Sequence, residues 1–98
     1  MKFFVKFEAF ESIVGDEETN LLRKSVGEQI QKIQESGKLV EGEVFVGMRG
    51  GFFLFDNIDN AAELEDLLGL KMHEHFKMET HATISFEELG EFFEREEG

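Results

Sequence analysis

The stretch GEVFVGMRGGFFLFD (Gly42–Asp56) predicts a β-hairpin, and the rest of the chain can be arranged around it. Successive side chains of a strand point to opposite faces of a sheet, so a sheet with one face in water is apolar on one parity only. Here both parities are apolar, with Val44 next to Phe45 and Phe52 next to Phe53. Both faces are therefore expected to be covered, one by the chain's own helices and the other by a second subunit.

The turn of this hairpin is expected at Arg49, Gly50 and Gly51, because glycines adopt the positive φ angles that a tight turn needs. The run Gly47–Gly51 is rich in glycine, but it joins two strands and lacks the strand–loop–helix context of a phosphate-binding loop. Arg49 at the tip of the turn either contacts an anionic ligand or is solvated.

The composition indicates a globular chain that forms one domain over residues 1–98, with 41% hydrophobic and 33% charged residues. It contains twelve Phe but no Trp or Tyr, and Phe packs into cores and dry interfaces without needing a polar partner. Because there is no Cys, disulfides, thiolate nucleophiles and Cys-ligated metal centres are excluded.

The net charge of −12 disfavours partners that are themselves anionic, namely nucleic acids and acidic membrane surfaces. The acidity is explained most simply as a contribution to solubility. The segment Met1–Phe10 is too short and too charged for a signal peptide, and no apolar run is long enough to span a membrane. We therefore expect a cytoplasmic protein.

Periodicity elsewhere predicts two more strands and three helices. They are a strand over Phe3–Phe10, a helix capped by Asp16 or Thr19 and ended by Gly37, a short helix between Asn60 and Gly69, a strand over Lys71–Thr83 and a terminal helix opening at Ser85. Gly27 inside the first helix either indicates close approach of another backbone, which we favour, or is simply tolerated.

This order, β-α-β-β-α-β plus a helix, predicts an α+β fold of the ferredoxin-like type, with a four-stranded antiparallel sheet and both main helices on one face. Two bare sheet faces packed together would make a dimeric α+β barrel. The terminal helix, with Leu89, Phe92 and Phe93, is expected to pack into the core or against the partner subunit.

Segments along nearly the whole chain carry a family resemblance: MKFFVKFEAF, KSVGEQIQKI, GGFFLFD followed by NIDNAAEL, and THATISFEEL. With them the chain resembles the small dimeric α+β barrel proteins related to muconolactone isomerase, in a branch of stand-alone domains. The resemblance implies an obligate dimer and a cavity beneath each sheet. The wider superfamily includes isomerases, cofactor-independent monooxygenases and ligand-sensing regulatory domains, so no reaction and no residue role is carried over.

The histidines of the fourth strand are one candidate site. His73 and His75 are two residues apart, which in a strand places both rings on one face, and two imidazoles with a carboxylate can bind a transition metal. The alternative, which we favour, is that they are polar residues on a solvent-facing side. We therefore assign no metal, and we expect no cofactor.

The second candidate site combines Lys6 and Glu8 of the first strand with Glu79 and His81 of the fourth. These groups could form an acid–base set lining a cavity. The alternative is a pair of cross-strand ion pairs, Lys6 with Glu79 and Glu8 with Lys77. The candidate catalytic residues are His81, Glu79 and Lys6, and the candidate ligand-binding residues are Glu8, His75 and Arg49.

These observations leave three hypotheses for the function. The favoured one is a homodimer, formed through the sheet face, that binds a small molecule or has a regulatory role without turnover. The second is a cofactor-independent isomerase or monooxygenase for a small aromatic or lactone-like acid, with His81 or Glu79 in a pocket between sheet and helices. The third is a structural oligomerisation module.

Overall fold

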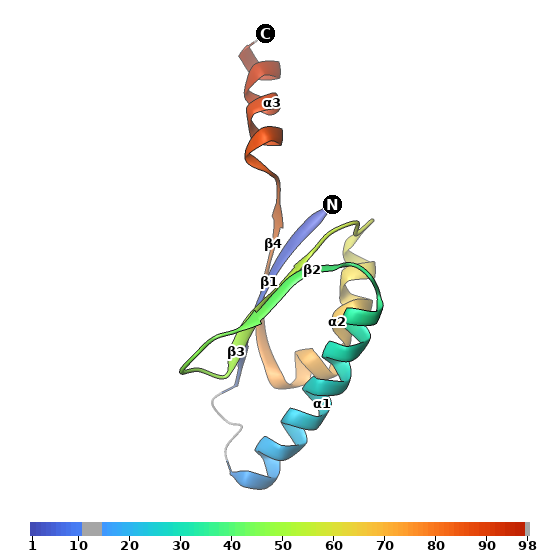
Figure 1. Cartoon of the computed structure of the whole chain (residues 1–98), viewed down its shortest axis with the longest axis vertical. Helices are drawn as coiled ribbons and strands as arrows, with labels where there is room; N and C mark the ends of the chain where they lie inside the picture. Colours follow the sequence, from blue (N-terminus) through green and yellow to red (C-terminus); the bar gives the residue numbers. More distant parts are fainter. Residues whose placement is uncertain (11–14, 98) are drawn as a thin grey trace.

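The computed structural model describes residues 1–10 and 15–97. Along the chain the elements are β1 (Lys2–Ala9), α1 (Asp16–Glu35), β2 (Leu39–Val44), β3 (Gly50–Phe55), α2 (Ala61–His75), β4 (Phe76–Thr83) and α3 (Phe86–Glu97) (Figure 1). The strands form one antiparallel sheet in the order β2-β3-β1-β4. The α+β class and the ferredoxin-like order predicted from the sequence are thus confirmed.

Helices α1 and α2 lie on the same face of the sheet and cover its odd-numbered side chains in β1 and β3 (Figure 1). The Phe7 and Phe53 rings stack with their centroids 4.8 Å apart, and the Phe76 ring meets Phe7 edge-on at 5.2 Å. The buried apolar core consists of Val5, Phe7, Ala9, Leu22, Ile33, Phe53, Phe55, Ile58, Leu64, Leu68, Met72 and Phe76.

The opposite face of the sheet, here called the open face, is not covered by the helices α1 and α2. It carries Phe4, Phe52 and Leu54, which are half-buried by their neighbours. Phe4 pairs with Leu54 in the register of β1 and β3, and its ring stacks on Phe52 at 5.5 Å. Apolar side chains therefore occupy both faces of the central strands, as the sequence pattern predicted. A second subunit over the open face remains a prediction.

The predicted turn of the hairpin is wrong by several residues. β2 ends at Val44 and β3 already begins at Gly50, and the positive φ angle of the turn belongs to Gly47 (φ 88°). Gly50 and Gly51 are strand residues with another role. A Cβ on Gly50 would lie 2.4 Å from the carbonyl oxygen of Phe7, so these glycines allow neighbouring strands to approach closely.

Of the predicted helix starts, two are confirmed. The Asn60 side chain accepts a hydrogen bond from the Glu63 backbone at 2.9 Å, and the Ser85 hydroxyl accepts one from the Glu88 backbone at 3.0 Å. For α1 the prediction of Asp16 or Thr19 as N-cap is wrong.

The N-cap of α1 is Gly15, so Asp16 is the first helical residue and adds negative charge to the positive end of the helix dipole. The predicted end of this helix is confirmed, since Gly37 has a φ of 74°. Among the described residues of the single chain, none approaches Gly27 closely, because a Cβ there would meet nothing within 4 Å, and packing against a second copy stays a prediction.

The fourth strand begins later than predicted. α2 continues past Gly69, where it kinks (φ 77°), and runs on to His75, so β4 starts at Phe76 instead of Lys71. Leu68 and Met72 face the core at helical spacing across this kink. The side chain of Gln29 from α1 supports the kink, because its amide donates a hydrogen bond to the carbonyl of Leu67 at 2.7 Å.

α3 extends from the end of β4 away from α1 and α2 (Figure 1). The described chain measures 59 × 26 × 19 Å as a result. None of the residues 86–97 is buried. The expectation that this helix packs into the core of its own chain is therefore wrong, and packing against a partner is the part of that prediction that stays open.

Candidate functional site

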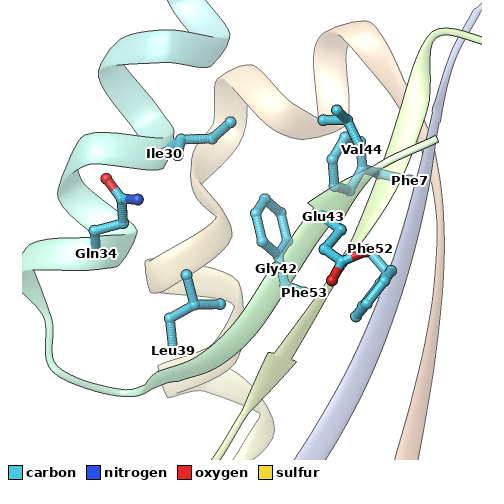
Figure 2. A pocket seen from close by; sticks show the side chains of 9 residues that line it. All are labelled: Phe7, Ile30, Gln34, Leu39, Gly42, Glu43, Val44, Phe52 and Phe53. Atoms are coloured by element: carbon cyan, nitrogen blue, oxygen red, sulfur yellow. The ribbon is translucent and has the colours of Figure 1, made fainter. Parts of the chain in front are cut away.

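A pocket of about 480 Å³ lies between α1 and the two strands of the hairpin (Figure 2). We call it the hairpin pocket. It is lined by Phe7, Ile30, Gln34, Leu39, Gly42, Glu43, Val44, Phe52 and Phe53. Most of these residues are apolar, so the pocket offers a mainly hydrophobic surface.

The two sides of the hairpin pocket come from local features of α1 and β2. Ile30 and Gln34 are four residues apart on α1, so both face the strands. Gly42 in β2 has no side chain, and a Cβ there would touch the Phe53 ring at 3.4 Å. A register shift between Leu39 and Glu41 marks a bulge at the start of the strand. The missing side chain at position 42 leaves the floor of the pocket open.

The polar groups of the hairpin pocket are few. The Gln34 amide sits on the α1 side of the pocket, where it can donate or accept a hydrogen bond (Figure 2). Glu43 and Phe52 border the pocket from the strands, but their side chains lie on the far side of the strands in this view (Figure 2). The pocket can therefore hold an apolar molecule and orient it through one amide.

A second cavity, also about 480 Å³, lies between the first half of α1 and the turn of the hairpin. We call it the turn groove. It is lined by Phe7, Thr19, Leu22, Arg23, Val26, Val44, Phe45, Met48, Arg49, Gly50 and Phe76. It shares Phe7 and Val44 with the hairpin pocket, so the two cavities adjoin along α1.

The predicted catalytic residues come together, but on the open face. Lys6 is directly opposite Glu79 in the sheet, and Glu8 is opposite Lys77. The Nε2 of His81 lies 3.0 Å from Oε1 of Glu79. The prediction that these groups line a pocket between sheet and helices is wrong, because their parity places them on the other side of the sheet.

The surface around these residues is shallow. A depression of about 110 Å³ is bordered by Lys6, Glu8, Lys77, Met78 and Glu79. His81 and Glu79 are exposed. In the single chain the depression is too small to enclose a typical organic ligand, since such pockets measure roughly 300–1,000 Å³.

The prediction that His73 and His75 share the face of a strand is wrong, because both residues belong to α2. Residues two apart on a helix point to nearly opposite sides. The Nε2 of His73 contacts Oε2 of Glu65 at 2.5 Å, while the His75 carbonyl accepts a hydrogen bond from the Phe10 backbone at 3.1 Å. Residues 1–10 and 15–97 contain no group of three or more His, Asp or Glu that could hold a metal ion.

Of the three predicted ligand-binding residues, Arg49 borders a cavity between α1 and the sheet. Its exposed side chain lies at the rim of the turn groove. The predicted site residues did not include Ile30, Gln34 and Gly42, which line the hairpin pocket. Gly42 could have been recognised from the sequence, because a glycine inside a strand often marks the close approach of a ligand or another backbone. Among the described residues, no helix is both long and apolar enough to cross a membrane.

Comparison with known proteins yields a structural match. No model of a protein family matches the sequence, and no curated protein sequence matches it. Among solved structures, the chain is similar to the crystal structure of muconolactone isomerase, with a TM-score of 0.68 and 19% sequence identity. The match covers 87% of this chain and 90% of that chain. The chain therefore has a muconolactone isomerase-like fold.

Proposed function

We propose that this chain forms a homodimer through the open face of its sheet and binds a small, mainly apolar molecule in the hairpin pocket without converting it. The observation that carries this proposal is the pocket itself, with about 480 Å³ of space walled by Phe7, Ile30, Leu39 and Phe53. That volume lies within the usual range of ligand sites, roughly 300–1,000 Å³. Its composition, apolar walls with one amide from Gln34, suits binding and orientation.

Binding is favoured over catalysis because the described residues that line the hairpin pocket include no acid–base pair. A proton transfer needs a titratable group within hydrogen-bond reach of the reacting atom. Glu43, which borders the pocket, has its carboxylate on the far side of the strand (Figure 2). A fold can host many reactions or none, so the likeness to an isomerase supports the fold alone.

A cofactor-independent isomerase or monooxygenase is the second candidate, and one contact favours it. His81 and Glu79 are 3.0 Å apart, and Lys6 is opposite Glu79. If two open faces pack together, these groups would be enclosed between two sheets, where a small acid could meet both a base and a cation. Replacement of His81 by Ala would abolish turnover under this candidate and leave ligand binding unchanged under the favoured one.

The favoured proposal is tested by filling the hairpin pocket. Ile30→Phe adds a ring where the half-buried Ile30 lines the pocket. The matched control is Leu21→Phe, on the same helix at an exposed position that borders neither cavity. The probe is 8-anilinonaphthalene-1-sulfonate, whose fluorescence rises in apolar sites. We expect saturable binding to the native chain, a loss of about tenfold in affinity (about 1.4 kcal/mol) for Ile30→Phe, and no change for the control.

Equal binding by all three proteins would contradict the proposal. Absence of any saturable binding, together with a crystal of the purified protein that shows only packed side chains at this place, would leave the oligomerisation module as the better description. Ordered density of an organic molecule between Ile30 and Phe53 would support the proposal directly and identify the chemical class of the ligand.

A further inference from the structure

The terminal helix α3 has an apolar stripe that the described residues of its own chain leave unburied. Phe86, Leu89 and Phe93 recur three and four residues apart, so they share one side of the helix, and Phe92 flanks them. Phe86 is 93% exposed, and Phe93 is 53% exposed. At 3.6 residues per turn, Glu87, Glu88 and Glu91 lie on the side away from this stripe, whereas Glu94, Glu96 and Glu97 border it. An isolated amphipathic helix of this length is marginal in water, so its stability calls for a surface to pack against.

Within the described residues, α3 extends away from α1, α2 and the hairpin turn, and only its first turn borders a hollow of its own chain, through Glu88 (Figure 1). α3 continues the direction of β4 and lies at one end of the molecule, whereas the hairpin turn and the beginning of α1 lie at the other end (Figure 1). A helix of twelve residues is about 18 Å long, much less than the 59 Å length of the molecule. Its partner surface is therefore expected on another molecule.

The turn groove matches α3 in both polarity and charge. Its walls include Leu22, Val26 and Phe76, which are apolar. Its rim carries Arg23 and Arg49, two of the three arginines in a chain whose net charge is −12. α3 is strongly acidic, and its acids are Glu87, Glu88, Glu91, Glu94, Glu96 and Glu97. A basic rim around an apolar groove is the arrangement that attracts an acidic amphipathic helix.

The open face also exposes apolar side chains, and its charge suits α3 less well. Acids outnumber lysines on its parity, which carries Glu8, Glu41, Glu43 and Glu79 beside Lys2, Lys6 and Lys77. It also has no arginine among the residues at these positions. An acidic helix would be repelled there more than at the turn groove, since like charges brought together lower affinity.

We infer that α3 of one copy docks in the turn groove of a second copy, with Phe93 and Leu89 on Leu22 and Val26. The acids that border the apolar stripe, Glu94 and Glu97, then lie against Arg23 and Arg49. In a two-fold dimer the exchange is reciprocal, so each copy both gives and receives one helix. Because the turn groove adjoins the hairpin pocket at Phe7 and Val44, the partner's helix closes one end of that pocket. This inference extends the proposed dimer, and it does not depend on the pocket being occupied.

The absence of cysteine makes a direct test possible. Phe92→Cys on one copy and Met48→Cys on another, co-expressed with tags of different size, are treated with a short bismaleimide crosslinker. The docked helix predicts crosslinked dimers that carry both tags. The control pairs Phe92→Cys with Leu70→Cys, which is exposed on α2 and borders neither the hairpin pocket nor the turn groove. We expect several-fold more crosslinked product at Met48 than at Leu70.

A charge exchange adds a second readout. Arg23→Glu with Arg49→Glu in the Met48→Cys copy should remove the crosslink, and Glu94→Lys with Glu97→Lys in the Phe92→Cys copy should restore it. Equal crosslinking at Met48 and Leu70, or crosslinks confined to one chain, would overturn the inference. Sedimentation of the native protein separates the two proposals: a dimer without the Met48 crosslink rejects only the docked helix, whereas a monomer rejects the dimer as well.

Discussion

The two faces of the sheet contain the same kinds of apolar side chain but have different surroundings. On the covered face Val5 and Phe55 are fully buried, and Phe53 is 3% exposed. On the open face Phe4, Phe52 and Leu54 are only half-buried. The difference shows that α1 and α2 bury the apolar side chains of one face. The apolar side chains of the open face stay partly exposed in the single chain.

The strand order explains how the apolar residues of the open face are distributed. In the order β2-β3-β1-β4, the two central strands contribute Phe52, Leu54 and Phe4. The edge strands contribute charged residues at the same parity, such as Glu43 on β2 and Glu79 on β4. The central strand β1 also carries Lys6 and Glu8 on this face, so the three apolar side chains form a patch bordered by charged residues. An apolar patch with charged neighbours is typical of a protein–protein interface. The comparison thus supports a dimer that forms through the open face.

The largest expected effect comes from a charge on the covered face. Phe55→Lys places an ammonium group where the native side chain has no exposure. Loss of a buried Phe costs about 3–5 kcal/mol, and an unpaired buried charge adds several more. Small domains have about 5–15 kcal/mol of stability, so we expect the variant to unfold. Circular dichroism with a urea titration measures this, and a cooperative transition near that of the native chain would contradict the assignment of β3.

A smaller effect is expected from the same substitution one residue earlier. Leu54→Lys puts the charge on the open face, opposite Glu41 in β2, where water can reach it in the single chain. The fold should be retained, and the dimer should weaken by at least about tenfold, or about 1.4 kcal/mol, because two lysines would meet in its centre. Analytical ultracentrifugation measures the dissociation constant. A dimer as tight as the native one would place the interface elsewhere.

The sequence predicted the fold well because its signals are local. The capping residues Asn60 and Ser85 and the apolar parity of β3 depend on neighbours a few positions away, and these predictions were confirmed. The boundary of α2 was missed since Gly69 normally ends a helix, whereas here Gln29 from α1 supports a kink and the helix continues.

The candidate site was predicted less well, because pockets form between elements that are distant in the chain. The hairpin pocket combines Ile30 with Gly42 and Phe53, and no spacing rule links these positions. The charged residues Lys6 and Glu79 did come together, because strand register could be derived from the predicted order of strands. Which face they occupy relative to the helices depends on the whole set of packed side chains, and the alternation of β1 alone left it open.

The smallest change, one added methyl group, contrasts a packed position with a free one. A Cβ on Gly51 of β3 would lie 2.3 Å from the carbonyl oxygen of Glu43 and 2.9 Å from the Phe7 ring. Gly51→Ala should therefore destabilise the chain by about 1–3 kcal/mol, the usual cost of overpacking. Gly27→Ala on α1 meets nothing within 4 Å and removes a flexible residue from a helix interior, so it should stabilise by up to about 1 kcal/mol.

Urea titrations of both glycine variants measure these free energies of unfolding. Opposite signs for the two substitutions would show that the covered face of the sheet is filled to the limit of one methyl group while the outer side of α1 is free. If Gly27→Ala destabilised the protein instead, another backbone would have to lie against α1 in the assembled molecule. That outcome would add α1 to the surfaces that a second copy covers.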